Sequence, residues 1–235
     1  MLEKLVIGRY LTFQDPKPKI TYADGDFVTQ PKLALMIEQS VREKQMVPKW
    51  DAKAGDFVRD NVQNQKVQVQ QKQRVSQISS GENQAKVHRN FQWLGYYGGA
   101  VSQVSFDNLD VLSGNFSGCW MTVYKKSGVT CVGHVGTVDD ATHAKTTAAK
   151  KAWVDFANAN RHAIERGFNP ARAWTNPDSR PPKIDGDGIP RIWGLVTGDE
   201  LISIYLYRGE KDWNRYRIAD WKVVPPSYMP ELGAI

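Results

Sequence analysis

Two side chains of this sequence, Cys119 and His134, have types and a spacing that allow thiol chemistry. A free cysteine has an unperturbed pKa of about 8.5, so an adjacent imidazole must accept its proton before it becomes a good nucleophile. The resulting thiolate attacks an amide carbon, the imidazolium protonates the departing nitrogen, and water then hydrolyses the thioester. We therefore interpret Cys119 as a candidate nucleophile and His134 as a general base that later acts as an acid.

The elements that must position this pair form a predicted β-hairpin. Two runs of alternating residues flank the pair 127–128, where glycine accepts the positive φ that a tight turn needs. With these two residues in the turn, His134 lies opposite Met121, and Cys119 lies diagonally across from His134. Diagonal neighbours on adjacent strands have Cβ atoms about 7–8 Å apart or less, which is within reach of a Cys–His contact.

The backbone around the thiol also has residues suited to an active site. Gly118 leaves room for a substrate to approach the sulfur closely. The N–H groups of Cys119 and Trp120 are candidate oxyanion donors. A non-catalytic interpretation remains open, because free cysteines are among the most buried residue types and a lone strand histidine is often structural. Cys131 lacks flanking glycines, and we interpret it as a packing residue.

The motif SGC…GHVGT around Cys119 and His134 resembles the catalytic hairpin of three kinds of bacterial glutamine deamidase. These are the cytotoxic necrotizing factors, the Burkholderia lethal factor and the chemoreceptor glutamine deamidase. They share a Ser-Gly-Cys motif and a histidine on the next strand. Phe116 stands where the toxins have the leucine of LSGC, and Ser113 stands where the lethal-factor and chemoreceptor types have threonine. The resemblance covers the stretch 112–137 only.

The resemblance implies conversion of a protein glutamine side chain to glutamate, without a metal or cofactor, on a β-sandwich core with outer helices. It implies that Ser113 orients the histidine or the substrate amide, and that amine acceptors would allow transglutamination. It also implies a toxin or secreted effector, with a host GTPase or a translation factor as the kind of protein substrate.

Two other functions remain open at this stage. The first is a cysteine protease that uses the same Cys–His pair. The second is a non-enzymatic protein-binding module that uses the glutamine-rich segment 61–78 and the aromatic segment 91–106. The glutamine-rich segment is either a long exposed strand or mobile arm, or a partner-binding edge strand.

Composition narrows the class of protein. The chain has 235 residues, 41% of them hydrophobic and 24% charged, which is ordinary for a globular protein and allows a sizeable core without disulfides. No run approaches the roughly 18 apolar residues of a membrane span. The net charge of +6 comes from scattered basic residues, which favours an acidic protein partner over nucleic acid. Two cysteines form no disulfide framework or paired metal motif, which favours a reducing compartment.

The N-terminal sequence MLEKLVIGRYLTF has an acidic residue and a short apolar run broken by Arg9. It is a poor signal peptide and a better first strand. We therefore expect the protein to be cytoplasmic in the producing cell, to be secreted without a cleaved signal peptide, and to act in the cytosol of a target cell.

The pattern of apolar residues predicts an α+β fold with a mixed or antiparallel β-sandwich core flanked by helices. We expect one catalytic domain over 1–235, in which 1–90 is an accessory or substrate-binding part. The predicted helices cover 31–44, beginning at proline, and 139–166, capped by Asp139 or Asp140 and stopped by Gly167. The predicted strands after the second helix cover 192–197, 201–208 and 216–224.

Overall fold

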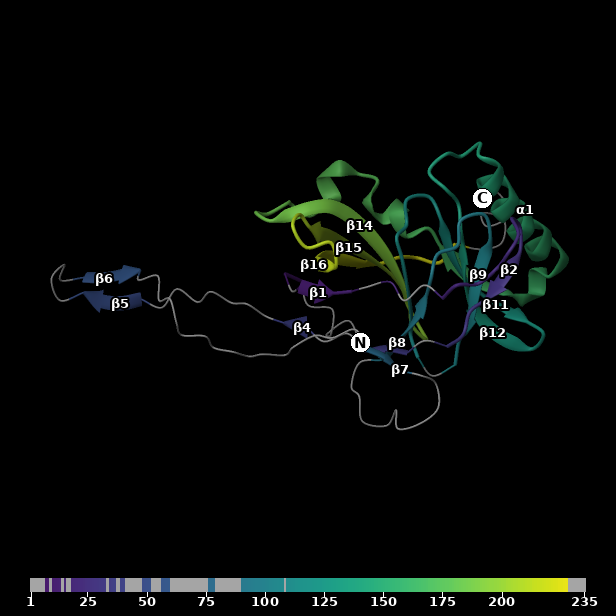
Figure 1. The fold of residues 1–235 in the computed structure, drawn as a ribbon, viewed down its shortest axis with the longest axis horizontal. Helices are drawn as coiled ribbons and strands as arrows, with labels where there is room; N and C mark the ends of the chain where they lie inside the picture. The colour runs from purple at the N-terminus through teal and green to yellow at the C-terminus, as the bar shows by residue number, and fades with distance from the viewer. Residues whose placement is uncertain are drawn as a thin grey trace.

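The computed structural model describes residues 7–8, 10–13, 15, 18–32, 34–36, 39–40, 48–51, 56–59, 76–78, 90–107 and 109–227. The α+β prediction is confirmed: two mixed β-sheets pack together, and an α-helix covers the smaller one (Figure 1). Within the described ranges, no helix combines the length and the apolar character needed to cross a membrane.

The larger sheet joins both ends of the described chain. Its strands, in order across the sheet, are β4 (Gln39–Ser40), β1 (Tyr10–Thr12), β16 (Arg215–Val223), β15 (Leu201–Gly209), β14 (Asp187–Val196), β10 (Val111–Gly114), β8 (Asn90–Leu94), β3 (Ala34–Met36) and β7 (Ser76–Ile78). Neighbouring strands are antiparallel except for the parallel pair β10 and β8. The three strands predicted over 192–224 are confirmed as β14, β15 and β16.

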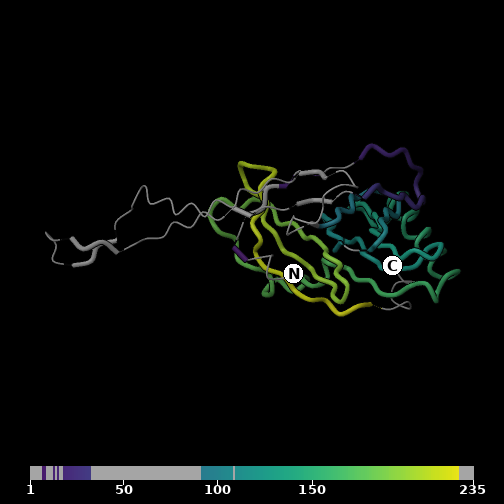
Figure 2. Tube along the Cα trace, turned by 90° about the horizontal axis from the view of Figure 1, so that it is seen from below, coloured from purple at the N-terminus to yellow at the C-terminus, as the bar shows by residue number. Residues whose placement is uncertain are grey.

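The smaller sheet carries the predicted catalytic hairpin. Its strands, in order, are β13 (Ile164–Phe168), β11 (Trp120–Lys126), β12 (Val129–Val135), β9 (Val101–Ser105) and β2 (Phe27–Thr29). A separate pair is formed by β5 (Pro48–Asp51) and β6 (Asp56–Arg59). Figure 2 shows the yellow-green strands of the larger sheet beside the teal and green segments of the smaller one.

The predicted register of the hairpin β11–β12 is confirmed. His134 lies opposite Met121, and the turn residues Ser127 and Gly128 have φ of 51° and 78°. Positive φ at both central positions is the signature of a type I′ turn, whose twist matches that of the strands it joins. The turn therefore fixes the alignment that places Cys119 diagonally from His134.

The two faces of the smaller sheet have separate cores. The inner face packs on the larger sheet through a buried cluster that includes Val104, Met121 and Val132. The outer face is covered by α1 (Ala144–Ala159), which buries Trp153 against Tyr124. Burying this aromatic contact on the outer face keeps the helix and the hairpin in one rigid unit.

The helix predicted for 31–44 is wrong in its described part, which contains β3 and β4 instead. Each of these short strands pairs with a distant strand, β3 with β8 and β4 with β1. The apolar residues of this segment fit the alternation of a strand as well as the period of a helix. Pairing with other strands of the sheet stabilises the strand form.

The second predicted helix begins later and ends earlier than expected. Asp139 and Asp140 precede it, and its N-cap is His143, whose side chain accepts from the Lys145 N–H at 3.1 Å. After the helix come the 3₁₀ turn η3 (Arg161–Ala163) and β13. Gly167 therefore lies in a strand, because β13 pairs with β11.

The glutamine-rich segment 61–78 is described only at 76–78, where β7 forms one end of the larger sheet beside β3. Residues 61–75 lie outside the described residues. Its interpretation as a partner-binding edge strand therefore stays a prediction. Within the first 40 residues, β1, β3 and β4 join the larger sheet and β2 joins the smaller one.

Candidate active site

Cys119 lies where the chain crosses from the larger sheet to the smaller one. It follows β10 by a short loop and directly precedes β11. Cys119 is only 2% exposed, and it lines a cavity of about 750 Å³ together with residues of the loops that follow β10 and β12 and with Tyr205 and part of β14. The thiol therefore lies at the inner wall of a cavity rather than on the protein surface.

His134 lies on β12 and is fully buried. The ring of Phe116 stacks on it with centroids 4.3 Å apart, and the ring of Tyr96 lies 5.4 Å away. Burial lowers the pKa of His134 to about 3, because the charged imidazolium would lose its hydration. The imidazole is therefore neutral at physiological pH, with a lone pair available, but it is a weak base unless a neighbouring negative charge such as a thiolate stabilises its charged form.

Hydrogen bonds define which nitrogen of His134 carries the proton. Ser113, at the end of β10, donates from Oγ to the Leu94 carbonyl at 2.7 Å. The same Oγ lies 2.8 Å from His134 Nδ1. A hydroxyl has one proton, so with that proton directed at Leu94 the oxygen accepts from Nδ1–H. The remaining nitrogen, Nε2, is then an unprotonated acceptor, and it is buried without a hydrogen-bond partner among the residues that the structure describes.

Ser113 therefore faces the histidine. Of the two roles that the sequence left open for it, the structure favours orientation of His134 over contact with a substrate amide. The contact joins the two sheets, because Ser113 belongs to the larger sheet and His134 to the smaller one.

The thiol of Cys119 has a different partner in this structure. Its Sγ lies 3.1 Å from Thr137 Oγ1 and donates weakly to the Thr137 carbonyl at 3.5 Å. Among the described residues it forms no hydrogen bond with His134. Burial raises the pKa of Cys119, while hydrogen bonds from the Thr137 side chain and from the backbone at Thr137 and Gly118 lower it by smaller amounts.

The resting pair is therefore a neutral thiol and a neutral imidazole, rather than the thiolate and imidazolium expected from the sequence. Both side chains lie on the inner face of the hairpin, since Cys119 and Met121 share a face and Met121 is opposite His134. A direct contact between the sulfur and the imidazole stays a prediction, which requires Cys119 to rotate away from Thr137.

The backbone at the thiol has room for a substrate. A Cβ added at Gly118 would meet only Thr137 Oγ1, at 3.9 Å, so this face of the loop is open. The N–H of Cys119 has no acceptor among the described residues. Trp120 belongs to the paired part of β11, opposite Val135. Of the two expected oxyanion donors, the Cys119 N–H is therefore the more available.

Two residues near the thiol, Thr137 and Asp139, were missed by sequence reasoning, whereas Tyr96 belongs to the aromatic segment 91–106 that the sequence indicated as a possible pocket wall. Thr137 contacts the sulfur, Tyr96 donates from its hydroxyl to the Thr137 carbonyl at 2.7 Å, and Asp139 lines the cavity. Burial, with smaller contributions from the charges of Cys119 and Asp139, raises the pKa of Tyr96 to about 12, so its hydroxyl remains a donor. The hairpin register places Cys119 opposite Gly136. The register alone could therefore have indicated that the next residue, Thr137, lies near the thiol.

Among the described residues, no group of three His, Cys, Asp or Glu side chains is placed to hold a metal ion. Cys131 is also buried and lies on the outer face, in the cluster beneath α1, as expected for a packing residue. Comparison with protein-family models, with curated proteins and with solved structures found no match.

Proposed function

We propose that this protein is a cysteine-dependent deamidase that hydrolyses glutamine side chains of another protein. The observation that supports this proposal is the state of His134. Its Nδ1 is held by Ser113, and its Nε2 is left as a buried, unprotonated acceptor on the same face of the hairpin as the thiol. A histidine held in this tautomer is what a thiol needs from a general base.

The position of the sulfur favours a side-chain amide over a main-chain peptide bond. Cys119 is 2% exposed and lines the cavity. A glutamine side chain is a slender arm whose carboxamide can enter such a space while the substrate backbone stays outside. A protease must instead admit a continuous chain on both sides of the bond it cleaves.

The reaction follows from these positions. The carboxamide enters along Gly118, and Cys119 rotates from Thr137 toward His134, whose Nε2 accepts the thiol proton. The sulfur attacks the carboxamide carbon, and the Cys119 N–H stabilises the oxygen of the tetrahedral intermediate. The imidazolium then protonates the departing nitrogen, which leaves as ammonia. Water, activated by the same imidazole, hydrolyses the thioester to glutamate and restores the thiol.

The charge of Asp139 suits release of the product. It lines the cavity and acts electrostatically on the Cys119 sulfur. A neutral carboxamide entering the site is not repelled by this carboxylate. The glutamate formed by hydrolysis is negatively charged, so its repulsion by Asp139 favours departure.

The experiment is to incubate the protein with candidate substrates, beginning with GTPases and translation factors, and to analyse them by mass spectrometry. We expect one glutamine to gain the mass that replacement of NH₂ by OH requires. Cys119→Ser and His134→Asn should abolish the change, whereas Cys131→Ser, a matched thiol removal on the outer face, should preserve it. Chain cleavage would indicate a protease. Tight binding without any thiol-dependent change would indicate a binding module. A toxin or effector that acts in a target cytosol is part of the same proposal.

A further inference from the structure

Two arginines line the cavity that contains Cys119, and neither forms an ion pair within the described part of the chain. Arg180 is exposed and donates from Nε to the Trp174 carbonyl at 2.8 Å, which leaves the end of its guanidinium available. Arg191 donates from Nη1 to the adjacent Pro190 carbonyl at 3.3 Å. Its Nε is buried, and no described residue forms a hydrogen bond with it.

Arg191 Nε is covered by protein, whereas Nη2 is not among the buried atoms and forms no hydrogen bond within the described residues, so a ligand can reach the arginine at Nη2. Guanidinium groups bind carboxylates through charge-assisted hydrogen bonds, and Nη2 is available as such a donor. The cavity wall beside the arginines is formed by Trp174 and Tyr205, whose rings meet edge to face with centroids 5.1 Å apart. These aromatic rings exclude water, which strengthens an ion pair between an arginine and the carboxylate of a short acidic side chain.

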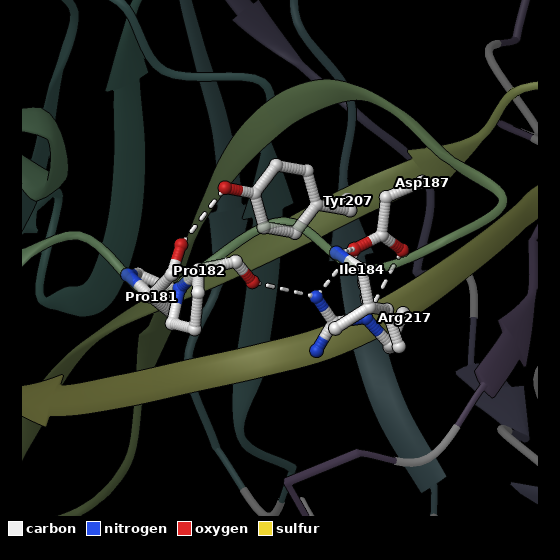
Figure 3. Close-up of polar contacts among 6 residues, drawn as sticks. All are labelled: Pro181, Pro182, Ile184, Asp187, Tyr207 and Arg217. Carbon is white, nitrogen blue, oxygen red and sulfur yellow. Dashed lines mark hydrogen bonds and ion pairs between the residues drawn. The ribbon is translucent and has the colours of Figure 1, made fainter.

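The segment that carries Arg180 is held firmly in place. Figure 3 shows Arg217 of β16 forming a buried ion pair with Asp187, with Arg217 Nε 3.0 Å from Asp187 Oδ1. Arg217 Nη2, which also bonds Asp187, donates to the Pro182 carbonyl at 3.2 Å, and Tyr207 donates to the Pro181 carbonyl at 2.8 Å. These contacts attach the proline-rich segment to β15 and β16, so Arg180 starts from a fixed backbone and loses less entropy on binding.

Among the described residues neither Asp15 nor Asp139 forms an ion pair with the two arginines of the cavity, although Asp15 and Arg191 both act electrostatically on Tyr216. Asp15 accepts from the Trp93 indole N–H at 2.8 Å. Asp139 follows β12 of the smaller sheet and acts on the thiol, whereas Arg191 belongs to β14 of the larger sheet. The cavity thus has an acidic residue beside the sulfur and unpaired cations at a second place on its wall.

We infer that Arg191 and Arg180 form a carboxylate-binding subsite that selects target glutamines with an acidic residue close by in the substrate chain. This inference rests on the proposed function, because it takes Cys119 as the point that the glutamine reaches. The subsite supplies the attraction that holds the substrate, while the neutral carboxamide is presented to the thiol. The subsite also gives a binding place for the acidic protein partner that the net charge predicts, at the cavity wall with the two arginines.

The test measures binding without chemistry, using the Cys119→Ser protein and short fluorescent peptides that each contain one glutamine. One glutamate is moved from three residues before the glutamine to three residues after it, and a second series has lysine in its place. At one or more positions we expect the glutamate peptide to bind about tenfold more tightly than its lysine counterpart. That difference should shrink as the salt concentration rises, because an exposed part of the ion pair is screened.

Variants distinguish this subsite from general attraction by a basic protein. Arg191→Gln should lose the preference for glutamate. Arg161→Gln, which removes the same charge at an exposed position outside the cavity, should retain it. Arg180→Gln, at an exposed residue whose replacement does not disturb the core, should weaken the preference. Circular dichroism confirms that each variant is folded.

The outcomes separate the inference from the proposed function. Equal binding of both peptide series, or an equal loss of preference in Arg161→Gln and Arg191→Gln, would overturn the subsite. Selective binding of acidic peptides without deamidation by the wild-type protein would overturn the deamidase and support the subsite. Deamidation that is indifferent to neighbouring charge would support the deamidase and overturn the subsite.

Discussion

Acidification should destabilise this protein through His134 by an amount that the structure allows us to work out. The imidazole has a pKa of about 3 in the folded protein, against 6.5 when exposed in the unfolded chain. Because the unfolded state binds the proton more readily, stability is fully present above about pH 6.5 and is lost progressively as pH falls toward 3. At pH 5 the loss is about 2 kcal/mol, since each pH unit below the unfolded pKa costs about 1.4 kcal/mol.

Measurement at pH 5 is the most robust choice. The predicted loss of stability at pH 5 depends on the pKa of His134 in the unfolded chain. It hardly depends on the pKa of His134 in the folded protein, provided that this pKa is well below 5. Urea unfolding followed by tryptophan fluorescence at pH 8, 7, 6 and 5, in the presence of a reductant, gives the free energy of unfolding at each pH. His162→Gln is a matched control, because His162 is exposed.

The wild-type protein and His162→Gln should lose stability in parallel between pH 8 and pH 5. His134→Asn should lose about 2 kcal/mol less over the same interval, because it has no imidazole to protonate. Nitrogen NMR of the wild-type protein should show a protonated Nδ1 and an unprotonated Nε2 at His134 throughout this range. An equal loss of stability in His134→Asn, or protonation of His134 near pH 6, would refute the argument that this residue is a buried neutral base.

Three further substitutions test other parts of the site. Thr137→Val removes the hydroxyl that stabilises the thiolate, so iodoacetamide should alkylate Cys119 several-fold more slowly at neutral pH; an unchanged rate would count against this role. Gly118→Ala should change the free energy of unfolding by less than about 0.5 kcal/mol, since the added Cβ has open space. It should slow the proposed deamidation roughly ten- to hundredfold if the substrate passes this face, and unchanged kinetics would show that the substrate enters by another route. Asp187→Asn breaks a buried ion pair and should cost about 3–5 kcal/mol in urea unfolding, against under about 0.5 kcal/mol for Asp155→Asn in an exposed pair.

The hairpin is the part of the site that could be predicted most fully from the sequence. Its register depends only on the turn residues Ser127 and Gly128 and on the alternation of the flanking strands, and both are local features. The strands over 192–224 were predictable for the same reason, since a short polar segment separates the two apolar runs of β14 and β15.

Features that depend on distant contacts could not be predicted in this way. The predicted helix at 31–44 was replaced in its described part by strands, because β3 and β4 find partners on β8 and β1. The contact of Ser113 with His134 follows from the packing of two sheets, which no local pattern encodes. The protonation states follow from burial: the sequence indicated a thiol that loses its proton to histidine, whereas the buried site keeps both groups neutral.

The non-catalytic interpretation of the pair can now be weighed against the geometry. A structural histidine in a core normally satisfies both ring nitrogens, because an unpaired buried polar atom costs about 1–3 kcal/mol. His134 satisfies Nδ1 through Ser113 and leaves Nε2 unpaired. Other buried atoms of the described residues are also unpaired, namely Trp153 Nε1, Arg191 Nε and both amide atoms of Gln92. Trp153 and Arg191 have no basic lone pair there, and the amide of Gln92 is not a base, so among these atoms only His134 Nε2 can accept a thiol proton. An unpaired basic nitrogen on the same face as the thiol, held in the tautomer that accepts a proton, has a chemical use, and packing alone gives no reason to retain it.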